Sequence, residues 1–243
     1  MPVILPRLRA RLADEGGFTL VELLVSCVLG MIVLGGAFTV LQVALAQGER
    51  VQQRVDTVQR GRITMEQITR QLRSQTCLGP GFPALTQADS NSVTFYADLG
   101  AGDFTPVRRR LVYSGGAIVE ETYPWVSGTL PDKAVFSPTP SGRRTLITGV
   151  TQNVTANNTP IPIFRYFAFA TTDPIRPSLE LLPAGNPLSL SKFDMARTVQ
   201  IDVSFVAQPL KGDPNDRVRT VLENSVFVRT SDPGDPERSP QCI

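Results

Sequence analysis

Few side chains in this 243-residue sequence could perform chemistry, and the most informative absence is histidine. Without His the chain can hold no Ser-His-Asp or Cys-His nucleophile pair, no His-ligated metal and no imidazole switch near neutral pH. Three cysteines are too few for a structural zinc site made of four Cys ligands. No nucleophile beside a general base is visible either. We therefore expect a protein that is not an enzyme and that carries no cofactor and no metal ion.

Basic residues in the second part of the chain could form a binding patch. Three arginines stand in a row from Arg108 to Arg110, and two more are Arg143 and Arg144. Alternation along a strand would send the middle arginine of the triplet to the opposite face from its two neighbours. Residues 77–243 carry a net charge of −1, and binding to DNA draws on many phosphate contacts. We do not expect nucleic acid to be a direct ligand.

Acidic residues near the C-terminus could hold calcium, which prefers carboxylate oxygens. They occur in Asp-Pro and Pro-Gly turns, where an Asp side chain bonds its own backbone. We therefore expect turns rather than a metal site at these positions, which are Asp213, Asp216, Asp232, Asp235 and Glu237.

One carboxylate has an unusual position, because Glu22 stands directly before 26 residues without any charge. As a helix, Leu23 to Ala46 would be about 36 Å long, enough to span a hydrocarbon core of about 30 Å. Arg7, Arg9 and Arg11 precede this stretch. The excess of positive charge predicts that the N-terminus stays in the cytoplasm and that the rest is exported.

Three interpretations of the apolar stretch remain open on these grounds. It could be a Sec signal peptide cut after Ala44-Leu45-Ala46, or a simple membrane anchor. In both cases Glu22 has no purpose, although an acidic group inside a spanning segment costs a few kcal/mol unless it is paired. In the third interpretation a leader is cut off before the apolar run begins.

The segment Gly16-Gly17-Phe18-Thr19-Leu20-Val21-Glu22-Leu23-Leu24-Val25 resembles the N-terminal signature of type IV pilins and type II secretion pseudopilins. The resemblance implies that a membrane-embedded prepilin peptidase cuts between Gly17 and Phe18. It also implies that the new amine of Phe18 is methylated. The partners it implies are this peptidase and other pilins or pseudopilins, which the chain would contact through its N-terminal helix.

The resemblance also gives Glu22 a purpose. In a stack of helices, its carboxylate could meet the Phe18 amine of a neighbouring subunit and so set the register of assembly, because either charge left alone in an apolar environment is costly. The alternative is a tolerated carboxylate at the lipid headgroups. The apolar residues around it should contribute helix–helix packing, and they are Leu20, Val21, Leu23 and Leu24.

A helical period continues beyond the apolar stretch. Three domains follow from this: a leader at 1–17, a long helix at 18–76 and a globular head at 77–243. Within the helix, about 23–46 would span the membrane and 47–76 would form an amphipathic stem. An apolar stripe should press the stem against the head, and Gly61 suggests a bend. The stripe consists of Val51, Val55, Val58, Met65, Ile68 and Leu72.

The head shows the pattern of an antiparallel sheet. Predicted strands lie at 92–96, 107–113, 117–122, 163–170, 198–207 and 217–229, and Ser114-Gly115-Gly116 predicts a hairpin. The fold class is therefore α+β, with a long N-terminal helix, transmembrane in its first half, packed on an antiparallel β-sheet domain as in pilins. The length, the helix end MEQITRQLRSQTC and the closing strands RTVQIDVSF and RTVLENSVFVRT resemble PilW-like minor pilins.

The three cysteines fall into two groups. Cys27 lies inside the apolar stretch, where we expect a small apolar filler. Cys77 and Cys242 should both be exported, where disulfides persist, and a bond between them would resemble the C-terminal disulfide of many pilins. Two free thiols are the alternative.

The sequence thus predicts a minor pilin, a structural and assembly subunit of a type IV pilus. It would first be a single-pass protein of the bacterial cytoplasmic (inner) membrane and then part of a filament at the cell surface. The alternatives are a minor pseudopilin of type II secretion, or a pilus-tip subunit that binds a surface or serves DNA uptake.

Overall fold

The computed structural model describes residues 17–79, 83–98, 105–129, 133–170, 178–183, 185, 189–210 and 219–228. The chain divides into two units, residues 1–52 and residues 53–243. In the first unit, every described residue is exposed to solvent. The second unit contains the β-sheets together with the last part of the long helix.

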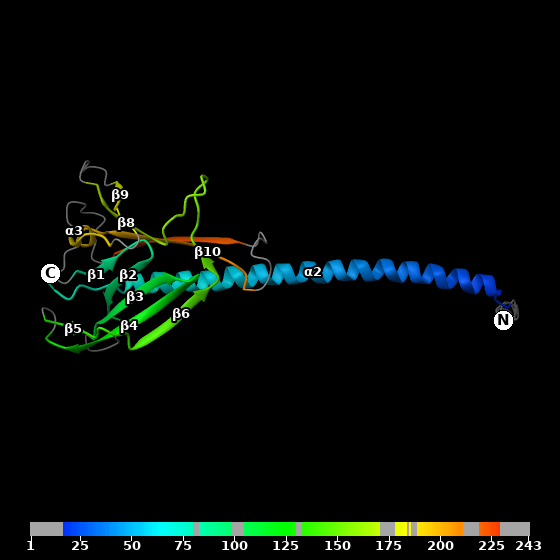
Figure 1. Cartoon of the computed structure of the whole chain (residues 1–243), viewed down its shortest axis with the longest axis horizontal. Coiled ribbons are helices and arrows are strands. Elements are labelled where there is room, and N and C mark those ends of the chain that lie inside the picture. The colour runs from blue at the N-terminus through cyan, green and yellow to red at the C-terminus, as the bar shows by residue number, and fades with distance from the viewer. Residues whose placement is uncertain are drawn as a thin grey trace, which may run out of the picture. The chain divides into compact units, whose positions relative to one another are not determined.

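The long helix α2 runs from Leu20 to Arg73 (Figure 1). Its first part is long and apolar enough to cross a membrane, as judged by length and composition, and none of that stretch is buried within the chain. A long apolar N-terminal helix followed by antiparallel sheets confirms the predicted α+β, pilin-like architecture.

The first sheet of the second unit has six strands. The order is β1-β2-β3-β4-β5, with β6 also paired to β4, and all neighbours are antiparallel. The strands are β1 (Leu85–Ala88), β2 (Ser92–Ala97), β3 (Val107–Ser114), β4 (Ala117–Ser127), β5 (Val135–Phe136) and β6 (Gly142–Thr148).

The second sheet has five strands in the order β11-β10-β8-β9, with β7 also paired to β10. The head therefore contains two sheets where the sequence suggested one. The elements are β7 (Val150–Thr151), β8 (Phe164–Phe169), β9 (Leu179–Leu181), the short helix α3 (Lys192–Ala196), β10 (Gln200–Ala207) and β11 (Thr220–Phe227).

The hairpin predicted at Ser114-Gly115-Gly116 is confirmed, and a second pair of consecutive strands forms another hairpin. Strands β3 and β4 meet at Ser114 and Ala117 across a two-residue turn. Gly115 and Gly116 hold this turn with φ angles of 57° and 73°, which side chains other than Gly rarely adopt. Strands β10 and β11 pair along their whole length in the second hairpin.

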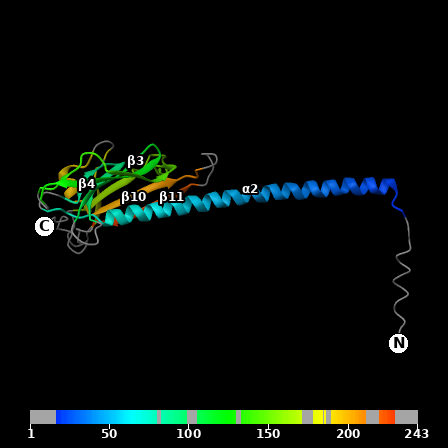
Figure 2. The ribbon, with the colours of Figure 1, turned by 90° about the horizontal axis from the view of Figure 1, so that it is seen from below.

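One hydrophobic core joins the two sheets and the end of α2. Figures 1 and 2 show the last part of α2 running beside both sheets. The Thr64 hydroxyl donates to the Leu146 carbonyl oxygen at the first sheet, and Asn224 on β11 of the second sheet donates to the Thr69 hydroxyl. The core side chains of α2 are Met65, Ile68 and Leu72, all of which are buried.

The predicted apolar stripe on the stem is correct only in its second half. Val51 and Val55 are 62% and 47% exposed, and Val58 is half-buried. The buried face begins instead with small residues, which let the helix come close to the sheet. They are Thr57, Gly61 and Thr64, and they continue into Ile68 and Leu72.

Gly61 has a packing role, and α2 continues through it. A Cβ atom added at this position would lie 2.2 Å from Cδ1 of Leu222 on β11 and 3.4 Å from Cβ of Ala207 on β10. The second sheet therefore approaches the helix backbone directly, which explains the small residue better than the expected bend does.

Candidate processing and assembly site

The chain is not helical where the sequence predicts a cut. Gly17, Phe18 and Thr19 precede α2 and are exposed, with Phe18 77% exposed. A Cβ atom added at Gly17 would meet nothing within 4 Å. No contact among the described residues therefore requires a glycine at position 17, so a requirement for Gly would come from another molecule.

Thr19 sets the start of α2. Its side-chain oxygen accepts a hydrogen bond from the backbone N–H of Glu22 at 3.3 Å, and its carbonyl oxygen accepts from the N–H of Leu23 at 3.1 Å. This is the arrangement of a helix N-cap. Glu22 thus stands in the first turn, where the partial positive charge of the helix N-terminus favours a carboxylate. Sequence reasoning missed this local role, although Thr-x-x-Glu is the spacing of a capping box.

The apolar residues predicted to pack between helices have no partner within the described chain. Leu20, Val21, Leu23 and Leu24 are 75%, 68%, 57% and 55% exposed. A Cβ atom added at any of the glycines farther along this stretch would also meet nothing within 4 Å, and these are Gly30, Gly35, Gly36 and Gly48. Such a surface is available to lipid or to other helices, which can come close at glycines.

A family model decides what this segment is. The prokaryotic N-terminal methylation motif matches residues 12–38. This match supports the resemblance to type IV pilins and pseudopilins. Neither the curated proteins nor the solved structures give a match.

Among the described residues, the motif covers Gly17, Phe18 and Thr19, which precede α2, and the first part of the apolar helix. A helix of this kind and composition suggests a membrane-anchored protein of the pilus type that assembles with other pilins and is processed by a prepilin peptidase. The match ends at residue 38, so it describes the helix and not the head.

The arginines of the head are separated as alternation predicts. Arg109 and Arg144 both bind the buried carboxylate of Glu120 on one face of the first sheet. On the other face, Arg110 and Arg143 each lie 3.7 Å from the carboxylate of Glu121. The triplet therefore forms two charge clusters rather than one basic patch.

The remaining arginine of the triplet, Arg108, stacks over the ring of Tyr123, with 4.7 Å between its guanidinium carbon and the ring centre. It also donates a hydrogen bond to the Ser137 carbonyl oxygen at 2.9 Å. Burial, together with the hydrogen bond to Glu121, raises the pKa of Tyr123. These contacts tie the arginines into the sheet.

The acidic residues considered for calcium all lie outside the described residues. Where the structure describes the chain, no three potential ligands of the types His, Cys, Asp and Glu gather into a group. Cys27 is free and exposed, whereas Cys77 is not free. Because Cys242 lies outside the described residues, the bond between Cys77 and Cys242 stays a prediction.

Proposed function

We propose that this chain is a minor pilin, a non-enzymatic subunit of a type IV pilus. It is inserted into the cytoplasmic membrane through the apolar part of α2, cut between Gly17 and Phe18, and methylated on the Phe18 amine. The mature chain then enters a filament at the cell surface. The observation that carries the proposal is the methylation motif at residues 12–38, together with the exposed, non-helical Gly17, Phe18 and Thr19 that lead into an uncovered apolar helix.

The geometry of the cut segment supports processing by a peptidase. The N-cap at Thr19 keeps Gly17 and Phe18 out of the helix, so the bond between them is open to such an enzyme.

In the proposed assembly, Glu22 sets the register of each subunit. Its carboxylate lies in the first turn of α2, close in sequence to the amine that cleavage creates on Phe18. Inside a stack of apolar helices, the carboxylate of one subunit pairs with the amine of the next. Removing one member of a buried pair costs about 3–5 kcal/mol, because the other charge is left uncompensated. A subunit in the wrong register therefore does not enter.

Mass spectrometry of the mature N-terminus tests the processing step. An N-terminal methyl-Phe18 supports the proposal, and an N-terminal Gln47 would support a Sec signal peptide instead. An intact leader would contradict both.

A charge variant tests the assembly step. Glu22→Ala is expected to stay in the membrane but to be lost from sheared filaments, and Glu22→Gln should behave alike, since it removes the charge at nearly constant size. Glu49→Ala is the matched control, because Glu49 is exposed on α2 beyond the uncharged stretch. Normal incorporation of Glu22→Ala would refute the register role.

A further inference from the structure

A hollow of about 350 Å³ opens on the first sheet, where β3, β4 and β6 lie side by side (Figure 1). Most of its lining is charged, and it consists of Arg109, Glu120, Thr122, Gly142, Arg143 and Arg144. A Cβ atom added at Gly142 would meet nothing within 4 Å. The hollow therefore has room beside the start of β6 for a group from outside the chain.

Two arginines of the hollow are held by the carboxylate of Glu120, whose side chain is only 6% exposed. Glu120 accepts a hydrogen bond from Nη1 of Arg109. It also accepts from Nε and Nη2 of Arg144, at 3.1 and 2.7 Å. Both guanidinium groups are thus positioned by the chain itself, and such preorganisation lowers the cost of binding a ligand.

Glu120 uses only some of the hydrogen-bond donors of these two arginines. The Nε–H of Arg109 is buried and has no hydrogen-bond partner in the part of the chain that the structure describes. Nη2 of Arg109 and Nη1 of Arg144 likewise donate to no described residue. A buried donor without an acceptor lowers stability. An anion in the hollow would offer acceptor oxygens to these guanidinium groups.

The charge of the hollow is unbalanced. Its lining has three arginines against one glutamate, which is an excess of two positive charges. Glu121 on the other face of the sheet does not remove this excess, because Arg110 and Arg143 share it, each at 3.7 Å. Residues 77–243 together carry a net charge of −1. The positive charge is therefore a local feature of this part of the sheet.

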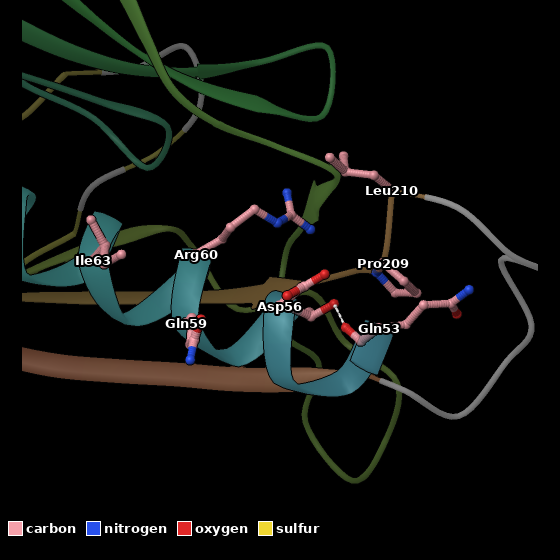
Figure 3. A pocket seen from close by; sticks show the side chains of 8 residues that line it. Gln53, Asp56, Gln59, Arg60, Ile63, Pro209 and Leu210 are labelled. Carbon is pink, nitrogen blue, oxygen red and sulfur yellow. Dashed lines mark hydrogen bonds between the residues drawn. The ribbon is translucent and has the colours of Figure 1, made fainter. Parts of the chain in front are cut away.

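A larger groove in the same unit has no such excess. It has a volume of about 460 Å³ and lies between α2 and the segment that follows β10 (Figure 3). Its charged lining residues are Asp56 and Arg60, which balance each other. Nη2 of Arg60 also donates to the Gln208 carbonyl oxygen at 3.1 Å. Charge thus favours the hollow on the first sheet as a site for an anion.

We propose that this hollow binds a phosphate group. At pH 7 a phosphate monoester carries about −1.5 to −2 charges and three strong acceptor oxygens. Its charge matches the excess in the hollow, and its oxygens can accept from more than one arginine. A carboxylate has one charge and two oxygens, which a single guanidinium can satisfy. The site lies wholly in the head, so it goes beyond the proposed function and does not depend on cleavage or assembly.

Equilibrium dialysis of the full chain in a neutral detergent against radiolabelled inorganic phosphate tests the site. We expect saturable binding, strong competition by glycerol 3-phosphate and weak competition by acetate. Arg144→Gln should weaken the binding about tenfold, since it removes charge-assisted hydrogen bonds but leaves Glu120 paired with Arg109. Arg62→Gln is the matched control, because Arg62 is exposed on α2 and outside the hollow, and it should bind phosphate like the parent.

Near-ultraviolet circular dichroism of each variant shows whether the head is still folded. If Arg144→Gln loses the signal, Arg143→Gln replaces it as the test, since that side chain is 64% exposed. No saturable binding at millimolar phosphate would overturn the proposal, as would equal competition by acetate. Unchanged binding by a folded Arg144→Gln would also overturn it, and would leave the arginines of β6 as charges that protect the strand from pairing with other chains.

The phosphate could come from a soluble compound or from a lipid headgroup, and nanodiscs separate the two sources. The full chain is placed in phosphatidylcholine nanodiscs with or without phosphatidic acid, whose headgroup is a phosphate monoester. Phosphatidylglycerol, a diester that is also anionic, is the control lipid. Loss of binding of radiolabelled phosphate with phosphatidic acid alone supports a headgroup in the site. Unchanged binding with all three lipids supports a soluble phosphate.

Discussion

Substitution of Gly61 by Ala tests how closely the helix and the second sheet are packed. The added Cβ would lie 2.2 Å from Cδ1 of Leu222, where ordinary carbon–carbon contacts are about 3.5–4.0 Å. The tip of the Leu222 side chain must therefore move by about 1.3 Å to restore an ordinary contact. Because Leu222 is half-buried and Cδ1 is the end of its side chain, part of this movement is available.

Two opposing contributions decide the magnitude. Overpacking of a filled site costs about 1–3 kcal/mol, while Ala in place of Gly inside a helix gains up to about 1 kcal/mol. We expect Gly61→Ala to lower the free energy of unfolding of the second unit by about 1 kcal/mol. In a unit of this size, that corresponds to a loss of about 2–4 °C in Tm.

Denaturant unfolding of the full chain in detergent, followed by near-ultraviolet circular dichroism, measures the change. Gly142→Ala is the matched control, since a Cβ atom there would meet nothing within 4 Å and the stability should stay the same or rise slightly. In a Leu222→Ala background, Gly61→Ala should become neutral or stabilising, giving a coupling energy of about 1–2 kcal/mol. If Gly61→Ala alone raised the free energy of unfolding by about 1 kcal/mol, the full gain of Ala over Gly in a helix, the close approach of Leu222 would not explain this glycine.

Two further predictions concern the head. Tyr166→Phe should destabilise by about 1–3 kcal/mol in denaturant unfolding, because the buried hydroxyl lies 3.0 Å from the carbonyl oxygens of both Asp89 and Ser92. Burial, with the Asp89 charge, raises the pKa of Tyr166, so its contribution should be complete below about pH 10 and fall above it, and the alkaline loss should be smaller in the Phe variant. Peptide mapping without reductant should find Cys77 joined to Cys242, and Cys77→Ser should then lower stability in denaturant; two free thiols would contradict this.

The general layout of the head could be predicted from the sequence where local signals are strong. Gly115 and Gly116 indicate their hairpin because few other residues adopt the required φ angles. Strand β6 was not predicted, because most of Gly142–Thr148 is exposed and its sequence does not alternate between apolar and polar residues. Helix α3 is only five residues long and is marked by the Ser191 cap rather than by any period.

Which face of the stem is buried could not be predicted from hydrophobicity. Val55 looks like a core residue in the sequence, and Thr57 and Gly61 do not. In the structure the helix backbone comes close to β10 and β11, so the contact requires small residues and leaves Val55 exposed. An aliphatic residue that packs against another molecule cannot be told from a core residue by the sequence pattern, because both kinds of contact bury apolar surface away from water.

The glycines of α2 differ in whether a contact within the chain requires a residue without a side chain. Gly61 is small because Leu222 and Ala207 leave no room for a side chain. Gly30, Gly35 and Gly36 have empty surroundings, although each costs up to about 1 kcal/mol relative to Ala in a helix. Nothing within the described chain offsets that cost, whereas close packing against helices of other molecules would. A Cβ atom at Gly17, before the helix, would likewise meet nothing within 4 Å, so no contact within the described chain explains the glycines at positions 17, 30, 35 and 36.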